Sequence, residues 1–447
     1  MSPADDATLR FPAGFRFGVA TAAHQVEGDN DHSDWWDFER LPGRIADGSR
    51  SGRACEHHQR FREDLSLVRE LHNDTYRFSV EWARVEPRPG QFDGAALAHY
   101  RAVAEACRSL GVEPLVTLHH FTLPRWFAAR GGWLAPDAVA DFRRYARAVV
   151  AALAPLVRLW VTLNEPMIFL YHGYLLGVWP PGERSLRRAV RAGRALVRAH
   201  VEAYKVLHEA PGFGGAAPQV GVAHNLLVFD PARPGHRWDR WAAAAQGAVF
   251  NWSFPDSFDG GRYCPPLGSG DAVPGWVPCQ DFVGVNYYMR RRVRFAPARP
   301  GALFGTEVQP PGVPRSDLGW EIYPEGLARV LRAAHRRYGR TLWVTENGIA
   351  DAHDTRRGAY VVHHLAAVAR VLGEGVPVAG YCHWSLYDNF EWAEGFSARF
   401  GLYEVDYATQ RRTLRAGSRV YAEIAAARAV PPRLAEQYPG PASRPTG

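Results

Sequence analysis

The chain has 447 residues, of which 47% are hydrophobic and 22% are charged, and its formal net charge is +7. This length and composition exclude a small disulfide-stapled scaffold and a disordered chain, and they fit either several domains or one large barrel. The positive charge does not by itself indicate nucleic acid, because the densest basic run, 290–294, contains no aromatic side chain on which a base could stack.

Short apolar or β-branched runs, typical of buried strands, recur along the whole chain. Eight of them are predicted as strands: 15–22, 75–79, 114–118, 159–163, 219–223, 282–286, 342–345 and 377–382. Longer stretches with helical periodicity lie between them and after the last: 56–71, 95–110, 137–154, 186–209, 240–251, 325–338, 361–372 and 414–428. Eight successive strand–helix units favour a closed parallel (β/α)₈ TIM barrel of the α/β class.

We expect a single catalytic domain, 1–430, followed by a proline-rich tail, 431–447, that is poorly ordered. An open, doubly wound sheet is the alternative, but no G-x-G-x-x-G motif follows the first strand. Two stretches rich in proline and glycine, 260–278 and 299–314, are predicted to be loops. The arginine run 290–294 is predicted to be a solvated face.

Nothing in the sequence indicates a membrane protein or a disulfide framework. Apolar runs such as 146–157 are shorter than the ~20 residues that span a bilayer, and the first residues include Asp5 and Asp6 without an apolar signal core. The five cysteines are odd in number and lack C-x-x-C spacing. We therefore expect a cytoplasmic protein with buried thiols, without a membrane or nucleic-acid partner and without a metal site.

Two of the predicted strands are followed by a glutamate. Asn164 and Glu165 follow the fourth strand, and Glu346 and Asn347 follow the seventh. Because the carboxyl ends of barrel strands meet at one mouth, both carboxyl groups are predicted to face the same cavity. Cleavage of a glycosidic bond needs such a pair, one group to protonate the departing oxygen and one to meet the anomeric carbon. For either glutamate alone, an ion pair at the barrel rim is an equally good interpretation.

Eight segments then carry a resemblance to a known family. They are FPAGFRFGVATAAHQVEG (11–28), DTYRFSVEWARVEP (74–87), TLHHFTLPRW (117–126), TLNEP (162–166), DFVGVNYY (281–288), LGWEIYPEGL (318–327), VTENG (344–348) and WSLYDNFEW (384–392). In this order they resemble glycoside hydrolase family 1, the retaining β-glucosidases and β-glycosidases. The resemblance implies a TIM barrel that hydrolyses terminal β-D-glucosyl residues of short oligosaccharides or aryl glycosides, with a small-molecule glycoside as its partner and no cofactor.

The resemblance also assigns roles to the two glutamates. It implies that Glu346 is the nucleophile of a double displacement, and that Glu165 is first the general acid and then the general base. It implies that Arg77 and Tyr288 hydrogen-bond the nucleophile and favour its charged form. Retention of configuration further implies that the two carboxyl groups lie about 5–5.5 Å apart.

Further residues match family positions that contact the substrate. The sugar-binding set is Gln25, His120, Phe121, Asn164, Asn286, Trp384, Glu391 and Trp392, with Trp384 as the apolar floor and Asn164 as a donor to the 2-hydroxyl. The leaving-group set does not rest on such matches: its residues are mostly aromatic or apolar and are predicted on variable loops at the barrel mouth. It consists of Phe169, His172, Asn225 and Trp320, with Ile168 and Tyr171 as further candidates. Buried polar groups fitted to each hydroxyl would reject sugars that lack it, because those groups would then stay unpaired.

One departure from the family pattern and one pair that keeps it bear on specificity. Phe121 stands where the family usually has tryptophan, so one donor to the sugar, most simply to its 3-hydroxyl, is lost. Glu391 and Trp392 are both kept, whereas relatives that act on 6-phosphoglycosides carry a serine nearby and a lysine downstream. The corresponding stretch, 394–401, contains Arg399 and no lysine, so phosphorylated substrates are not expected.

Three alternatives remain at this stage. A transglycosylase would use the same intermediate but pass it to a sugar acceptor. A sugar-binding barrel without catalysis is disfavoured because Glu165 and Glu346 are both present. A metal-dependent barrel enzyme is suggested only by the adjacent His119 and His120, and neighbouring residues of a strand point to opposite faces.

Overall fold

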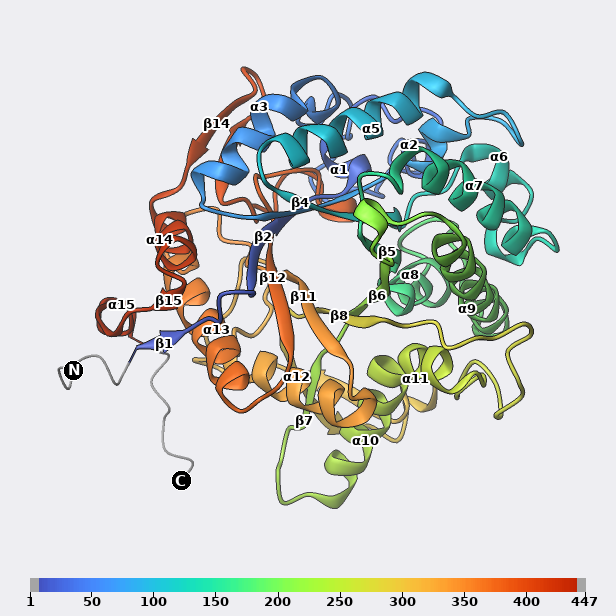
Figure 1. Ribbon diagram of the computed structural model, residues 1–447. Coiled ribbons are helices and arrows are strands. Elements are labelled where there is room, and N and C mark those ends of the chain that lie inside the picture. Colours follow the sequence, from blue (N-terminus) through green and yellow to red (C-terminus); the bar gives the residue numbers. More distant parts are fainter. Residues whose placement is uncertain (1–7, 440–447) are drawn as a thin grey trace.

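Eight parallel strands form a closed ring in the computed structural model, which describes residues 8–439. In chain order they are β2 (Arg16–Ala20), β3 (Thr75–Ser79), β4 (Glu113–His119), β5 (Leu159–Asn164), β6 (Gln219–Asn225), β8 (Phe282–Asn286), β11 (Thr341–Asn347) and β12 (Val378–Trp384). Each pairs with the next, and β12 pairs with β2 to close the ring, which lies at the centre of Figure 1. The eight predicted strands and the TIM barrel are confirmed.

The strands are apolar because both of their faces are covered, by helices outside and by side chains inside the barrel. Every residue of β3 and of β5 is buried. The backbones also approach closely. A Cβ atom on Gly18 in β2 would lie 2.6 Å from the carbonyl oxygen of Thr75 in β3, so this position needs glycine.

Helices surround the barrel, and most of them have bounds near those predicted (Figure 1). They are α3 (His57–Glu70), α5 (Gly94–Ser109), α7 (Ala138–Leu153), α9 (Leu186–Glu209), α10 (Arg237–Gly247), α11 (Ser253–Gly260), α12 (Pro324–Tyr338), α13 (Arg357–Gly373) and α14 (Arg419–Ala427). Side-chain caps define some of the starts. Asp93 accepts hydrogen bonds from the backbone N–H groups of Ala95 and Ala96 at 2.7 and 3.1 Å, which are free at the first turn of α5.

Two predicted helices have different bounds in the structure. The stretch 240–251 is not one helix, because a π-helical turn, η4 (Ala248–Trp252), separates α10 from α11. The last helix begins at Arg419 rather than at 414, because Leu414 belongs to the hairpin of β13 (Tyr403–Asp406) and β14 (Arg411–Leu414).

Short elements fill the connections between strands and helices. The short α-helices are α1 (Ala23–Val26), α2 (Asp34–Phe38), α4 (Trp82–Val85), α6 (Arg125–Ala129), α8 (Pro166–Leu170) and α15 (Pro432–Gln437). The single turns are η1 (Gly132–Leu134), the π-helical η2 (Tyr171–Leu176), η3 (Phe213–Gly215), η5 (Pro300–Ala302), η6 (Trp392–Glu394) and η7 (Ala416–Ser418).

A small second sheet lies outside the barrel. It consists of β7 (Val228–Pro231), β9 (Arg290–Phe295) and β10 (Gly305–Val308), in the order β10-β9-β7. The prediction of a solvated face at the arginine run and of a loop over 299–314 is therefore corrected: the run forms β9, and β10 lies within the supposed loop. The arginines are compatible with a strand because carboxylates far away in the sequence pair with them, as described below.

The two ends of the described chain lie side by side, where β1 (Leu9–Arg10) pairs antiparallel with β15 (Ala429–Val430) (Figure 1). Part of the predicted tail, Pro432–Gln437, is helix α15, and residues 440–447 lie outside the described residues. All five cysteines are free thiols, four of them buried, and burial raises the pKa of the Cys382 thiol to about 12. Within residues 8–439, no helix combines the length and the apolar character needed to cross a bilayer.

Candidate active site

The ends of β5 and β11 bring the two predicted glutamates into one cavity of about 670 Å³. Glu346 belongs to β11 itself, and Glu165 follows β5 directly, with Pro166 beginning α8. Glu165 has a φ of +45°, in the left-handed region that non-glycine residues seldom adopt, and such conformations occur often at functional sites. The predicted meeting of the two carboxyl groups at the barrel mouth is thus present in the structure.

Glu346 is bound by a cation and a phenol. Arg77, from β3, donates from Nη1 to Glu346 Oε1 at 2.6 Å, and the hydroxyl of Tyr288 donates to Oε2 at 2.6 Å. Arg77 is itself buried, with 1% of its surface exposed. Burial raises the pKa of Glu346, but Arg77 and Tyr288 oppose that rise because both favour the carboxylate.

Within the described part of the chain, Glu165 is bound only by neutral amides. Asn286 and Asn225 donate from Nδ2 to its Oε1 at 2.8 and 3.0 Å, and among residues 8–439 no donor is bonded to Oε2. Burial, and next to it the charge of Glu346, raise the pKa of Glu165 to about 8. At neutral pH, Glu165 is therefore the group that carries a proton, while the arginine-bound Glu346 is the group that ionises first.

A chain of polar side chains connects the two glutamates. Asn164 accepts from Arg77 Nη2 at 2.7 Å and from Asn286 Nδ2 at 3.1 Å, both on Oδ1. Arg77 also binds Glu346, and Asn286 also binds Glu165. Asn164 therefore links the donor of one glutamate to the donor of the other. The hydroxyl of Thr345 donates to Asn286 Oδ1 at 2.6 Å and fixes the orientation of that amide. Arg77 and Asn286 lie behind the residues that line the cavity.

The predicted sugar-binding residues gather at the barrel end of the cavity. His120, Asn164, Trp384, Glu391 and Trp392 line it, and Gln25 lies behind Glu391, donating to Glu391 Oε2 at 3.3 Å. Two buried polar atoms here, Gln25 Oε1 and His120 Nδ1, have no hydrogen-bond partner in the described protein. Because unpaired buried polar groups are costly, their presence indicates a site that a hydrogen-bonding ligand completes.

The charge state of this part of the site also follows from burial. Burial, and then Arg77, lower the pKa of His120 well below its usual value, so its imidazole is neutral. Burial, and then the charge of Glu346, raise the pKa of Glu391 to about 8. A neutral imidazole and a protonated carboxyl can each both donate and accept, as a sugar hydroxyl requires.

Phe121 forms a carbon-only wall of the cavity. Its ring centroid lies 5.0 Å from that of Trp179 and 5.1 Å from that of Trp392, and its φ is +73°. His120 stacks 5.9 Å from Trp384 and 6.0 Å from Trp392. The apolar floor predicted for Trp384 is therefore part of a larger aromatic surface, which suits the flat, apolar face of a sugar ring.

Three of the four residues predicted for the leaving-group side line the cavity: His172, Asn225 and Trp320. Phe169 does not. It is 2% exposed and packs 5.5 Å from His119 and 5.9 Å from Tyr174, in the core outside the barrel. Its prediction is corrected for this reason: α8 turns that side chain toward the core.

Ile168, a further candidate for the leaving-group side, also lines the cavity. Other cavity residues were not assigned to the site from the sequence: Val178, Trp179, Leu227, Met289, Arg291, Asp317, Leu318, Ala393, Glu394 and Phe400. No motif distinguishes Trp179 from the other tryptophans, of which the chain has 15 in total. Arg291 belongs to the arginine run, and its place at the cavity depends on the pairing of β9, which the sequence does not indicate.

The two adjacent histidines of β4 and its following loop point apart. His119 packs 5.5 Å from Trp133 and 5.5 Å from Phe169, whereas His120 faces Asn164 at 3.1 Å inside the barrel. They therefore cannot share one ion. Across residues 8–439, no group of three or more histidine, cysteine, aspartate or glutamate side chains is arranged to hold a metal.

Comparisons with known proteins agree with this geometry. The sequence model described as Glycosyl hydrolase family 1 matches residues 7–268 and 277–430. Beta-glucosidase A of Thermotoga maritima is 33% identical, over 93% of this chain and 97% of that protein, and the beta-glucosidase of Agrobacterium sp. is 34% identical, over 95% and 97%. The structure of a beta-glycosidase from Pyrococcus horikoshii superposes with a TM-score of 0.89 at 38% identity, covering 96% of this chain and 98% of that one.

Proposed function

Because the chain belongs to glycosyl hydrolase family 1 and is a retaining β-glycosidase, we propose that it hydrolyses terminal β-D-glucosyl residues with Glu346 as nucleophile and Glu165 as acid and base. One observation carries the assignment of roles. Glu346 is held by Arg77 and Tyr288, whereas Glu165 is held by two amides and has a pKa raised to about 8. The first arrangement favours a carboxylate and the second a carboxylic acid.

In the first half of the reaction, a carboxylate oxygen of Glu346 attacks the anomeric carbon as the bond to the glycosidic oxygen breaks. Glu165 gives its proton to that oxygen, and the alcohol leaves. Both amides bind Oε1 of Glu165, which leaves Oε2 free to carry the proton. The products of this half are a covalent glycosyl-enzyme and the carboxylate of Glu165.

In the second half, the carboxylate of Glu165 takes a proton from water, and the water oxygen attacks the anomeric carbon from the side that the leaving group vacated. The bond to Glu346 breaks and its carboxylate returns to Arg77 and Tyr288. Two inversions give retention. The charge of Glu346 is lost in the intermediate, which lowers the pKa of Glu165 and makes it a base when a base is needed.

We propose the leaving-group side for His172, Asn225 and Trp320, and the sugar-binding roles for Gln25, His120, Phe121, Asn164, Asn286, Trp384, Glu391 and Trp392. The unpartnered atoms of Gln25 and His120 support the sugar-binding set. Unphosphorylated sugars fit the site better than 6-phosphosugars, because Arg399 is engaged elsewhere: it donates to Asp388 Oδ2 and to the carbonyl of Val405, both at 3.3 Å. A cytoplasmic location and the absence of a nucleic-acid partner stay predictions from the sequence.

Chemical rescue tests the two catalytic roles against each other. We expect Glu346→Gly to lower kcat by roughly 10⁴-fold or more, and azide to restore turnover of a dinitrophenyl β-glucoside with an α-glucosyl azide as product. In the matched variant Glu165→Gly, azide should instead give the β-glucosyl azide, because it attacks the glycosyl-enzyme from the other side. An unrescued Glu346→Gly, or the reverse pattern of products, would falsify the assignment.

A further inference from the structure

The tryptophan on the leaving-group side stands on a tight turn, Ser316–Glu321, which we call the Trp320 loop. The backbone N–H of Gly319 donates to Ser316 O at 2.9 Å, and the N–H of Ser316 donates to Trp320 O at 2.9 Å. Gly319 has a φ of +76°. The ring of Trp320 lies 5.5 Å from that of Tyr288, the donor to Glu346, and it lines the cavity. The position of this loop therefore sets one wall of the site.

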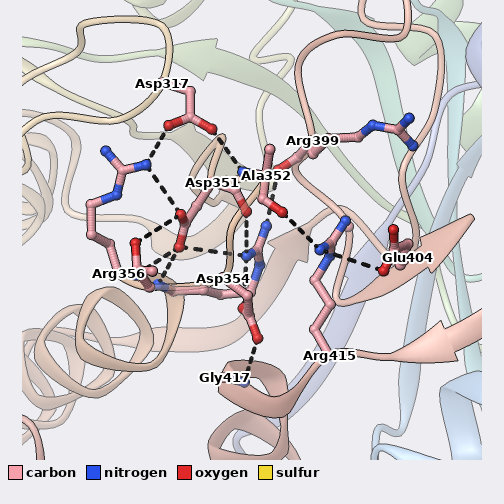
Figure 2. Close-up of polar contacts among 12 residues, drawn as sticks. Asp317, Asp351, Ala352, Asp354, Arg356, Arg399, Glu404, Arg415 and Gly417 are labelled. Carbon is pink, nitrogen blue, oxygen red and sulfur yellow. Dashed lines mark hydrogen bonds and ion pairs between the residues drawn. The ribbon is translucent and has the colours of Figure 1, made fainter.

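The beginning of the Trp320 loop is tied to the segment that follows β11. Asp317 donates from its backbone N–H to Ala350 O at 2.9 Å and accepts from the N–H of Ala352 at 2.7 Å. Arg356 binds Asp317 and also donates to Asp351 Oδ1 at 3.1 Å, and Figure 2 shows Asp317, Arg356 and Asp351 joined in this way. This end of the loop is thus fixed to the segment directly after β11, the strand that carries Glu346.

The other end of the loop is held by Glu321 and two arginines of β9. Arg290 donates from Nε to Glu321 Oε1 at 2.8 Å, and Arg292 donates from Nε to Oε2 at 3.0 Å. Glu321 is 7% exposed, and its backbone forms a β-bridge with Arg290. Hydrogen bonds between charged partners are directional and strong, so they fix the backbone that carries them.

The alternation of β9 explains why the arginine run is used in this way. Successive side chains of a strand point to opposite faces, so Arg290 and Arg292 share one face, where Glu321 lies. Arg291, between them, points the other way and lines the cavity. Glu321 itself does not line the cavity, so any effect of Glu321 on the reaction passes through its neighbours.

We propose that Glu321 is a positioning residue that holds Trp320 against Tyr288 and so gives the site its preference for planar, aryl leaving groups. This rests on the proposed function in one respect, that Trp320 lies on the leaving-group side. A buried carboxylate between two arginines contributes little net stability compared with apolar packing. The ion pairs of Glu321 instead fix the position of the Trp320 indole ring, so that an aryl group can stack on it.

The test compares aryl and alkyl leaving groups in Glu321→Gln. We expect kcat/KM for 4-nitrophenyl β-glucoside to fall about tenfold, mainly through KM, as expected for the loss of one aromatic contact, while kcat/KM for methyl β-glucoside changes less than about twofold. Trp320→Ala should show the same selective loss, and the double variant should lose no more than Trp320→Ala alone, because both substitutions remove one interaction.

Controls separate this role from a general effect on folding. Glu325 also pairs with two arginines, Arg332 and Arg370, but lies outside the cavity, so Glu325→Gln should keep the aryl-to-methyl ratio. If Glu321→Gln does not fold, Arg292→Gln should show the same selectivity change with a smaller size. An equal loss on both substrates, no loss, or additivity with Trp320→Ala would overturn the proposal. Failed azide rescue of Glu346→Gly would instead refute the catalytic roles and leave this ratio test intact.

Discussion

At the scale of single residues, the two glutamates differ in the groups that donate to them. An arginine and a tyrosine bind Glu346, and two asparagines bind Glu165. A guanidinium stabilises a carboxylate directly, whereas an amide stabilises it only as a dipole. The same side-chain type can therefore act as an anion at one strand end and as an acid at another, within one cavity.

This difference predicts how the reaction depends on the leaving group and on pH. In Glu165→Ala, kcat/KM should fall by about 10²–10⁴-fold for alkyl β-glucosides but far less for dinitrophenyl β-glucoside, whose leaving group needs little protonation. The proposed acid role requires a protonated Glu165, so kcat/KM of the native enzyme should decline as pH rises through about 8. The variant should lack that decline. Equal losses on both substrates, or an unchanged alkaline limb, would contradict the acid role.

Single residues also mark the limit of what the sequence can predict. Sequence motifs predicted the roles of four residues, Glu165, Glu346, Arg77 and Tyr288. The structure adds the hydrogen bonds that these side chains make. Phe169 was predicted on the leaving-group side because it is an aromatic residue of a loop expected at the barrel mouth. Its direction depends on how α8 packs against His119, and no local pattern carries that information.

At the scale of elements, the site depends on how closely β11 and β12 approach at their carboxyl ends. A Cβ atom on Gly348, two residues after the proposed nucleophile Glu346, would lie 1.8 Å from the carbonyl oxygen of Trp384. No flexible side chain is involved, so the clash can be relieved only by moving backbone. The two strand ends, one with Glu346 and one with Trp384, would have to separate.

We therefore expect Gly348→Ala to lower kcat by about 100-fold, the loss expected when reacting groups move by about 1 Å. It should also lower the free energy of unfolding by about 1–3 kcal/mol, as overpacking does. Both are measurable by steady-state kinetics and chemical denaturation. Gly14→Ala is the control, since nothing lies within 4 Å of a Cβ there. Native kcat in Gly348→Ala would show that the close approach is not needed.

Helices and strands were predicted well where their burial alone determines the sequence pattern. The bounds of β3 and β8 match the predictions residue for residue, and every residue of both strands is buried between the surrounding helices and the barrel interior. The strand β9 was missed because its arginines read as solvent-exposed. Their partners, Glu321 and Asp230, lie 29–60 residues away in the sequence, and only the fold brings them near.

At the scale of the whole molecule, the buried acid of the site has a cost for stability that depends on pH. Glu165 has a pKa of about 8 in the folded protein, against about 4.3 for a free glutamate. Between these values the folded state binds more protons than the unfolded state, so the free energy of unfolding falls as pH rises. A tenfold change in an ionisation constant corresponds to about 1.4 kcal/mol, so the total effect amounts to several kcal/mol at most.

Replacing the carboxyl group of Glu165 by an amide should remove this loss of stability at high pH. We expect Glu165→Gln to have nearly the native Tm at pH 5 and a higher Tm than the native enzyme at pH 9. Glu105→Gln, at a half-exposed ion pair with Arg101 on α5, is the control and should follow the native curve. Thermal unfolding at a series of pH values measures both. Parallel curves for Glu165→Gln and the native chain would show that Glu165 does not titrate in this range.

The polar chain from Glu165 through Asn286, Asn164 and Arg77 to Glu346 has one more consequence. Groups coupled this closely release their protons as a set, in macroscopic steps that belong to the whole assembly. A bell-shaped rate profile of this enzyme would therefore shift on both flanks when any single link is replaced. Changing Asn164 alone, a side chain that never gains or loses a proton, should move the apparent ionisation constants of two glutamates at once.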